Sequence, residues 1–421
     1  MKEKLRHTPE GVRDIYHSEC KRKKALELKL HDVLALYGYQ DIETPAFEFF
    51  DVFNSDTGTV SSREMFKFFD RNNNTLVLRP DMTPSIARSA AKYYYDCRFP
   101  LRLSYVGDTF MNHHSYQGKP AQKTELGAEH INDDSPEADA EAVIMMIDCF
   151  LAAGLDEFRI DIGQTEFYRA VIDSLKVEDE IKARIHELIE NKNSLGMELL
   201  LSGLDIEEEY RVILEEYNEL DGDVAMLEKA AGLTANPRCR KALDRLKQVY
   251  DVICEYGYER YIGFDLGMVN YYDYYTGIIF RGYTYGTGDA IGKGGRYDNL
   301  LLQFGKDAPA IGFTILIDDL MMALSRQNIS VSIKDFDYAV LLYKKADRRK
   351  AISLVSSLRD DGIRTELSVH DENGSLDSRL KFIKYQGARK AFVLEGDMVD
   401  IHDFVTDQRS RISLQEFREE Y

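Results

Sequence analysis

Segments that resemble β-strands disappear from this sequence between about residues 166 and 258 and return afterwards. Before that stretch, runs such as LRLSYVGDTF and FRIDIGQT have the apolar pattern of strands. Within it, runs such as EDEIKARIHELIENKN repeat apolar residues at helical spacing. After it, YIGFDLGMV and PAIGFTILI again favour strands. The chain is therefore expected to leave an antiparallel sheet, form a helical insertion over about residues 166–258, and re-enter the sheet.

A second change of pattern follows Gln327. The strand-like runs YAVLLY, IRTELS and KAFVLE alternate there with helical segments, which is typical of a parallel α/β domain. We therefore expect an α+β protein with two domains, residues 1–328 and residues 336–421.

Two helices of the first domain have clear boundary signals. Ser18 is predicted to cap a helix that runs to Tyr37 and stops at Gly38. Ser135 and Pro136 begin another helix, which Gly154 ends. Both helices carry an apolar stripe, so both are expected to cover a sheet.

The composition narrows the class of protein. The 421 residues carry a formal charge of −19, which argues against a protein coated in nucleic acid, because phosphate contacts need clustered Lys and Arg. No signal peptide and no apolar run long enough for a membrane helix is evident. The five cysteines form no Cys-x-x-Cys pair, so a zinc ribbon is not expected. We expect a cytoplasmic protein with no metal and no cofactor.

The glycine-rich run YTYGTGDAIGKGGRYDNL does not match a phosphate-binding loop, because Gly294 follows Gly292-Lys293 where Ser or Thr is required. Its glycines are expected to serve turns and close backbone packing. Isolated polar groups on predicted strands, such as Glu125 and Glu129, are individually more typical of structural hydrogen bonds.

Taken in order, however, the motifs resemble those of the class II histidyl-tRNA synthetases. The resemblance covers residues 7–325 and rests on TPEGVRDI, YGYQDIETPAFE, LVLRPDMTPSIAR, YVGDTFMNHHSYQGK with ELGAE, DYYTGIIF, GKGGRYDNL and PAIGFTILIDDL. It implies a class II synthetase-like antiparallel sheet with flanking helices. The terminal segment resembles the α/β anticodon-binding domain of those enzymes.

Three cationic positions of that family are changed here. Met111 stands where motif 2 has its ATP-binding arginine, and His113 stands at the following glutamate position. Asn270 replaces the arginine that activates the substrate carboxylate, and Asp319 replaces the motif 3 arginine. Adenylate formation needs positive charge against phosphate oxygens, and loss of one such donor costs on the order of 10²–10³ in rate. The resemblance therefore implies a chain that is not an active synthetase.

The amino-acid half of the site is retained. By the family pattern, Asp81 and Thr83 match residues near the α-amino group of histidine, and Glu125 replaces a glutamine there. Glu129 and Tyr275 match residues that hold the imidazole. The predicted vestigial histidine pocket consists of Asp81, Thr83, Glu125, Glu129, Tyr274 and Tyr275.

A synthetase-like chain with a damaged ATP site resembles the regulatory subunits of ATP phosphoribosyltransferase. The resemblance implies a non-catalytic subunit that joins a short-form catalytic subunit in the first step of histidine biosynthesis and contributes to feedback control by L-histidine. It also implies a dimer of this chain within a hetero-oligomer, without tRNA as a partner.

Two alternatives remain open. One is a diverged but active histidyl-tRNA synthetase, in which Lys119 and Arg281 are the nearest substitute cations in sequence. The other is a sensor of histidine or tRNA that binds a partner through its C-terminal domain.

Overall fold

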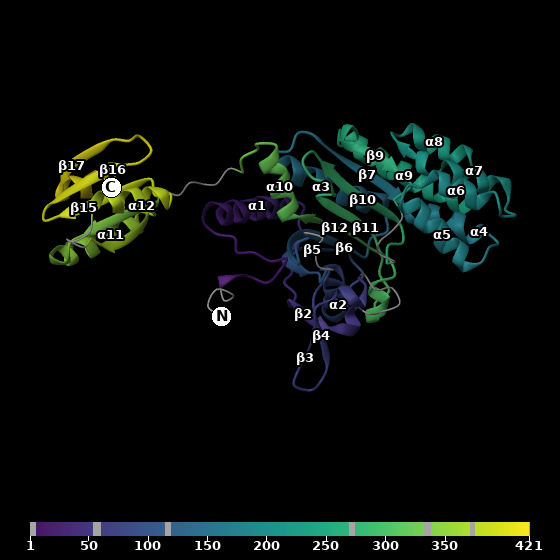
Figure 1. Ribbon diagram of the computed structural model, residues 1–421, viewed down its shortest axis with the longest axis horizontal. Helices are drawn as coiled ribbons and strands as arrows, with labels where there is room; N and C mark the ends of the chain where they lie inside the picture. The colour runs from purple at the N-terminus through teal and green to yellow at the C-terminus, as the bar shows by residue number, and fades with distance from the viewer. Residues whose placement is uncertain are drawn as a thin grey trace. The chain divides into compact units, whose positions relative to one another are not determined.

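The chain divides into two units, Met1–Val331 and Ser332–Tyr421, and each is described by itself. The computed structural model describes residues 6–53, 60–113, 119–268, 274–331, 338–370 and 375–420. Figure 1 shows the ribbon of both units, with labels on many of their helices and strands.

A nine-stranded sheet forms the centre of the first unit. Its strands run in the order β1 (Gln40–Asp41), β5 (Leu101–Phe110), β6 (Gln122–Ile131), β12 (Ala310–Leu316), β11 (Gly292–Arg296), β10 (Ile278–Thr284), β7 (Phe158–Gln164), β9 (Ile262–Asp265) and β8 (Asp221–Gly222). The α+β class is confirmed, but the expected antiparallel sheet is in fact mixed, because β1 pairs with β5 and β9 with β7 in parallel. A parallel neighbour needs a crossover connection, and the helical insertion supplies one between β7 and β9.

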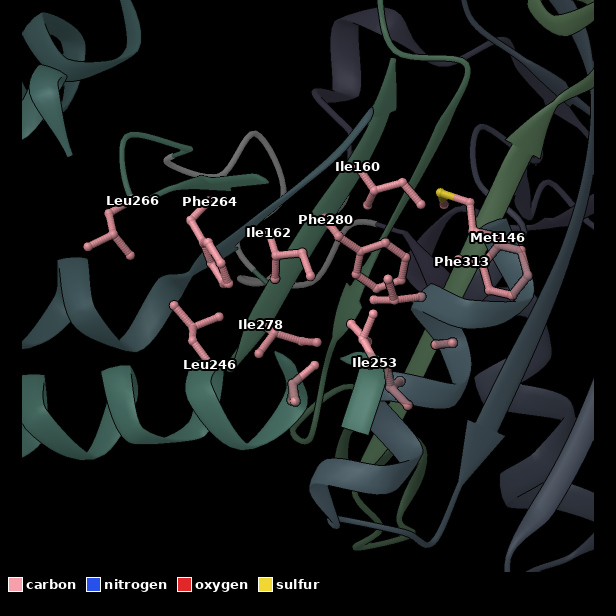
Figure 2. Packing of buried hydrophobic residues seen from close by; sticks show 14 of the residues in the cluster. Met146, Ile160, Ile162, Leu246, Ile253, Phe264, Leu266, Ile278, Phe280 and Phe313 are labelled. Carbon is pink, nitrogen blue, oxygen red and sulfur yellow. The ribbon is translucent and has the colours of Figure 1, made fainter. Parts of the chain in front are cut away.

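Three long helices cover one face of this sheet. They are α1 (His17–Leu36), α3 (Pro136–Ala153) and α9 (Pro237–Glu255), and they share one apolar core with the sheet. Figure 2 shows Met146 of α3 and Leu246 and Ile253 of α9 among the strand residues Ile162 and Phe280. The opposite face of the sheet is thereby left for the candidate site.

The insertion is helical, as its periodicity predicts. It contains α4 (Thr165–Ser174), α5 (Asp179–Glu190), α6 (Ser194–Leu201), α7 (Glu208–Glu216), α8 (Ala225–Gly232) and α9. Only the two-residue strand β8 interrupts the helices, where it pairs with β9. Because the buried residues of α4 to α9 belong to the same apolar cluster as the sheet, the insertion is part of this core and not a separate subdomain.

A small antiparallel sheet lies beside the candidate site. Its order is β2 (Phe47–Phe49), β4 (Thr75–Leu78) and β3 (Lys67–Phe69). Strands β3 and β4 form a hairpin, and Asp70 closes its turn by accepting the backbone N–H groups of Asn72 and Asn74. The helices α2 (Thr83–Tyr93) and α10 (Ile317–Arg326) complete the unit, with short 3₁₀ turns at 50–52, 62–64, 217–219, 259–261 and 301–304.

The boundary signals succeed for α3 and for the C-terminal end of α1, where Gly38 follows the cap residue Tyr37 at φ +81°. Ser135 accepts the N–H of Ala138 at 3.1 Å, and Gly154 ends α3 at φ +99°. The prediction that Ser18 caps α1 is wrong, because this helix begins at His17 and its cap residue Tyr16 makes no side-chain cap bond. None of the helices in the described ranges is long and apolar enough to cross a membrane.

The second unit is a five-stranded sheet in the order β14 (Arg364–Val369), β13 (Tyr338–Tyr343), β15 (Lys390–Glu395), β16 (Met398–Asp403) and β17 (Arg409–Ser413). Its first three strands are parallel, as the alternating pattern predicts, and β16 and β17 extend them antiparallel. The helices are α11 (Arg348–Asp360), α12 (Leu376–Tyr385) and α13 (Leu414–Glu420), with a 3₁₀ turn at 345–347. Apolar clusters with α11 and α13 on one side and α12 on the other show that both faces are covered.

A buried ion-pair node ties the first unit together. Asp139 of α3 has no exposed surface, and its carboxylate contacts Arg296 of β11 and Arg245 of α9, each at 2.7 Å. Arg296 also donates to the backbone carbonyl of Asp133 at 3.1 Å. The node therefore joins the helical layer, the end of the insertion and the central sheet.

Replacing Asp139 with Asn should strongly destabilise the first unit, because two guanidinium groups would lose their common counter-charge. Breaking a buried pair costs about 3–5 kcal/mol. The exposed Glu137 lies on the same helical turn, so Glu137→Gln is the matched control and should cost about 1 kcal/mol or less. Chemical denaturation measures both values, and equal losses for the two variants would contradict the role of the node.

Candidate functional site

Strand β6 presents two carboxylates on the face of the sheet that α1, α3 and α9 leave uncovered. Side chains alternate along a strand, so Glu125, Gly127 and Glu129 share this face. Glu129 lies opposite Gly312 of β12, where a Cβ atom would be 1.7 Å from the Glu129 Oε2. Only glycine at position 312 lets this carboxylate lie across the neighbouring strand.

Two glycines of the run GKGGRY also leave room for neighbouring side chains. A Cβ atom at Gly295 would lie 2.7 Å from the ring of Tyr275, and one at Gly294 would lie 2.4 Å from the ring of Phe280. Close packing against aromatic rings is therefore the reason for these glycines, as the sequence predicts.

The start of α2 brings Asp81 and Thr83 to Glu129. Thr83 Oγ1 donates to Glu129 Oε1 at 2.8 Å, and the Tyr297 hydroxyl donates to Oε2. Asp81 Oδ1 accepts the backbone N–H of Thr83 at 3.1 Å, and its Oδ2 accepts from the Tyr274 hydroxyl at 3.4 Å. Residues separated by almost 200 positions in the sequence thus meet at one point.

Glu125 lies nearby in a separate set of hydrogen bonds. Its carboxylate accepts from Thr109 at 3.0 Å and from Thr314 at 3.2 Å, and it is buried. All six predicted pocket residues therefore lie in this region of the sheet, although Asn270 and Asp273 fall outside the described residues.

A small cavity lies among these groups. Its volume is about 20 Å³, which is enough for about one water molecule and too small for an amino acid. Of the predicted residues, Asp81, Thr83, Tyr274 and Tyr275 line it, while Glu125 and Glu129 are not among its lining residues. The sequence reasoning missed the other lining residues, which are Tyr105, Lys293, Tyr297, Gly312, Phe313 and Thr314.

Burial disfavours negative charge at this site. It raises the pKa of Glu129 to about 8, although the hydrogen bonds from Tyr297 and Thr83 oppose this. It also raises the pKa of Asp81 to about 6, and here the positive charge of Lys293 acts in the opposite direction. A ligand with cationic N–H groups would favour the ionised carboxylates, whereas an anion alone would meet repulsion.

A second, larger hollow contains the altered ATP positions. Met111, His113 and Asp319 all line one groove of about 1250 Å³. Asp319 pairs with Lys123 of β6 at 2.8 Å. Asp318 pairs with Lys23 of α1 at 2.7 Å and accepts the N–H of Thr124 at 2.9 Å. These two carboxylates therefore link the start of α10 to α1 and β6.

The buried Glu129 should make stability fall as the pH rises. Its pKa is 4.5 when unperturbed and about 8 in the fold, so between these values the unfolded chain binds fewer protons than the folded chain. The loss amounts to about 1.4 kcal/mol for each unit of the pKa shift. Glu129→Gln keeps a neutral side chain of similar shape, so its unfolding free energy should fall less between pH 5 and pH 8. Denaturation at a series of pH values tests this, and parallel curves for the two proteins would contradict it.

The sequence and the fold match those of known proteins. A sequence model of the family described as "Histidyl-tRNA synthetase" matches residues 11–320. Among solved structures, an "ATP phosphoribosyltransferase regulatory subunit/histidyl-tRNA synthetase" from Bacillus halodurans is 31% identical, with a TM-score of 0.82 over 93% of this chain and 98% of that one. A histidyl-tRNA synthetase from Nostoc is 20% identical, with a TM-score of 0.78 over 99% of both chains, and it supports the fold alone.

Curated relatives are more specific. A protein of Acetivibrio thermocellus is 36% identical over 97% of this chain and 98% of its own length, and one of Clostridium acetobutylicum is 38% identical over 87% and 90%. Both are named "ATP phosphoribosyltransferase regulatory subunit". The chain therefore belongs to the family of ATP phosphoribosyltransferase regulatory subunits, which has the fold of the histidyl-tRNA synthetases.

Proposed function

We propose that this chain is a non-catalytic regulatory subunit that assembles with a short-form ATP phosphoribosyltransferase in the first step of histidine biosynthesis. In this proposal it raises the activity of the catalytic chain and makes that activity sensitive to L-histidine. It acts in the cytoplasm as a dimer within a hetero-oligomer, and tRNA is not a partner. The synthetase-like domain is residues 1–328, and the anticodon-binding-like domain is residues 336–421.

The observation that carries the proposal is the Asp319–Lys123 ion pair. An arginine at position 319 would offer positive charge to a nucleotide in the groove. The Asp319 carboxylate instead repels phosphate. It also pairs with Lys123 and neutralises the charge of that lysine. The ion pair stabilises the fold and offers no free positive charge to a phosphate group. This favours a non-catalytic chain that acts through an interface with a partner.

The pocket supports the histidine part of the proposal. Histidine carries an α-ammonium group and an imidazole. The half-buried carboxylate of Asp81 and the buried carboxylates of Glu125 and Glu129 are suitable acceptors for such N–H groups. Because the cavity holds only about one water molecule, we propose that histidine binds a wider conformation of the pocket. A ligand that binds one of two conformations shifts the population toward it, which is how the signal would reach an interface.

A diverged synthetase is the second candidate, and one contact favours keeping it. Lys119 lines the same groove as Met111 and Asp319, and it lies close enough to His113 to lower the pKa of that imidazole, second to burial. Lys119 is thus placed where a substitute for a lost arginine would be needed.

Mixing this chain with a short-form ATP phosphoribosyltransferase should give one stable complex with a raised transferase rate. Coupling between sites is typically about 1–3 kcal/mol, so histidine should shift the apparent substrate affinity by about 5- to 150-fold. Gel filtration combined with transferase assays, with and without histidine, measures both effects.

Asp319→Asn is the control for this experiment, because stimulation should not depend on a charge in the former ATP groove. The variant should therefore stimulate nearly as well as the natural chain. Separate elution of the two proteins, together with a transferase rate that ignores this chain, would sink the regulatory proposal.

ATP–pyrophosphate exchange with histidine should remain at background, because loss of even one oxyanion-stabilising donor costs about 10²–10³ in rate. Lys119→Met is the matched variant and should leave that background unchanged. Exchange at an ordinary synthetase rate that is lost in Lys119→Met would instead establish the second candidate.

A further inference from the structure

Lys293 lies on the pocket face of the sheet, in the glycine-rich run to which the sequence analysis assigned no binding role. It is opposite Thr314 of β12 and opposite Arg281 of β10. Gly295, two residues along β11, is opposite Gly312, which in turn is opposite Glu129. Since residues paired across strands share a face, Lys293 lies on the same side of the sheet as Glu129.

The cavity combines charges of both signs. Lys293 lines it together with Asp81, Thr83 and Tyr274. Among the lining residues that the structure describes, Asp81 carries the one carboxylate and Lys293 the one ammonium group. The two charges interact, because Lys293 opposes the effect of burial on the pKa of Asp81. Glu129 lies behind the Thr83 and Tyr297 hydroxyls, which adds a further acidic group to one side of the cavity.

This pattern is complementary to a zwitterion. The carboxylates suit the ammonium and imidazole groups of an amino acid, but its α-carboxylate needs a cation of its own, because a buried charge without a partner is costly. The synthetase resemblance would assign that duty to an arginine, and Asn270 stands at that position in this sequence. The chain therefore needs another basic group at the cavity wall.

We propose that Lys293 binds the α-carboxylate of the amino-acid ligand, taking the part of the cation that Asn270 cannot supply. The proposal rests on the proposed histidine-binding function and assigns the specificity of that same pocket for an amino acid over an amine. Lysine suits this task because its ammonium group has three donors on a flexible four-carbon chain.

A simpler role for Lys293 is to neutralise Asp81 without touching any ligand. The two roles predict different responses to histamine, which has the ammonium and imidazole groups of histidine but no carboxylate. If Lys293 only neutralises Asp81, its removal changes the binding of histidine and histamine alike. If Lys293 binds the α-carboxylate, its removal weakens the binding of histidine and not that of histamine.

Calorimetry on the full chain in complex with the short-form transferase tests this, with L-histidine and histamine as probes. Lys293→Met should lower the affinity for histidine by about 10- to 100-fold, as expected for the loss of a hydrogen bond between charged groups. The affinity for histamine should be unchanged or higher. Lys293→Arg keeps the charge and should retain most of the histidine affinity. Histamine binding also shows that each variant still has a folded pocket.

Arg281→Gln is the matched control. Arg281 is the direct cross-strand neighbour of Lys293 on the same face but is not among the residues that line the cavity. It should change histidine affinity by less than about twofold, since screened charges outside the site contribute little. An equal loss in both variants would show a general field effect and overturn the proposal.

The remaining outcomes distinguish the role of Lys293 from the histidine-binding function of the pocket. Equal histidine binding by Lys293→Met and the natural chain would overturn the role of Lys293 but leave the histidine pocket intact. Parallel losses of histidine and histamine would assign Lys293 to neutralisation of Asp81. Absence of histidine binding to the natural complex would reject the pocket function itself, and the role of Lys293 with it.

Discussion

The position of β11 depends on a buried carboxylate on the helix-covered face of the sheet, opposite the candidate pocket. Asp139 of α3 contacts Arg296 at the end of β11, and the same carboxylate contacts Arg245 of α9. A fully buried carboxylate requires such partners, because moving an unpaired charge from water into the protein interior costs free energy. By fixing β11, the node also fixes the strand that carries Lys293 and Gly295 into the pocket. Packing on one face thus determines the geometry of the other.

The pocket itself depends on the absence of side chains. Gly312 leaves room for the carboxylate of Glu129, and Gly295 leaves room for the ring of Tyr275. Larger residues would push these groups out of the layer above the sheet. The result is a dense set of hydrogen-bonded acids and tyrosines around a cavity of about 20 Å³. The proposed binding of histidine requires this cavity to widen, because it holds only about one water molecule.

Two acidic residues at the start of α10 have a structural role. Asp318 and Asp319 begin α10, where the helix dipole favours negative charge. Their pairs with Lys23 and Lys123 connect three elements at the wall of a large groove. Positions that would contact phosphate in a synthetase therefore contribute to the stability of the scaffold.

The sequence by itself determined the order of the elements, the helical insertion, the cap of α3 and the identity of six residues that meet near one cavity. Local patterns are sufficient for the first three features, because apolar periodicity and capping act over a few residues, whereas the six residues follow from the resemblance to the histidyl-tRNA synthetases. The tertiary structure decided the parallel pairing of β9, the burial of Asp139 and the place of Lys293. These depend on strand register and on contacts such as Asp81 with Tyr274, which are 193 positions apart. No local pattern encodes which side of a strand faces a cavity, because that is fixed only when β10, β11 and β12 align.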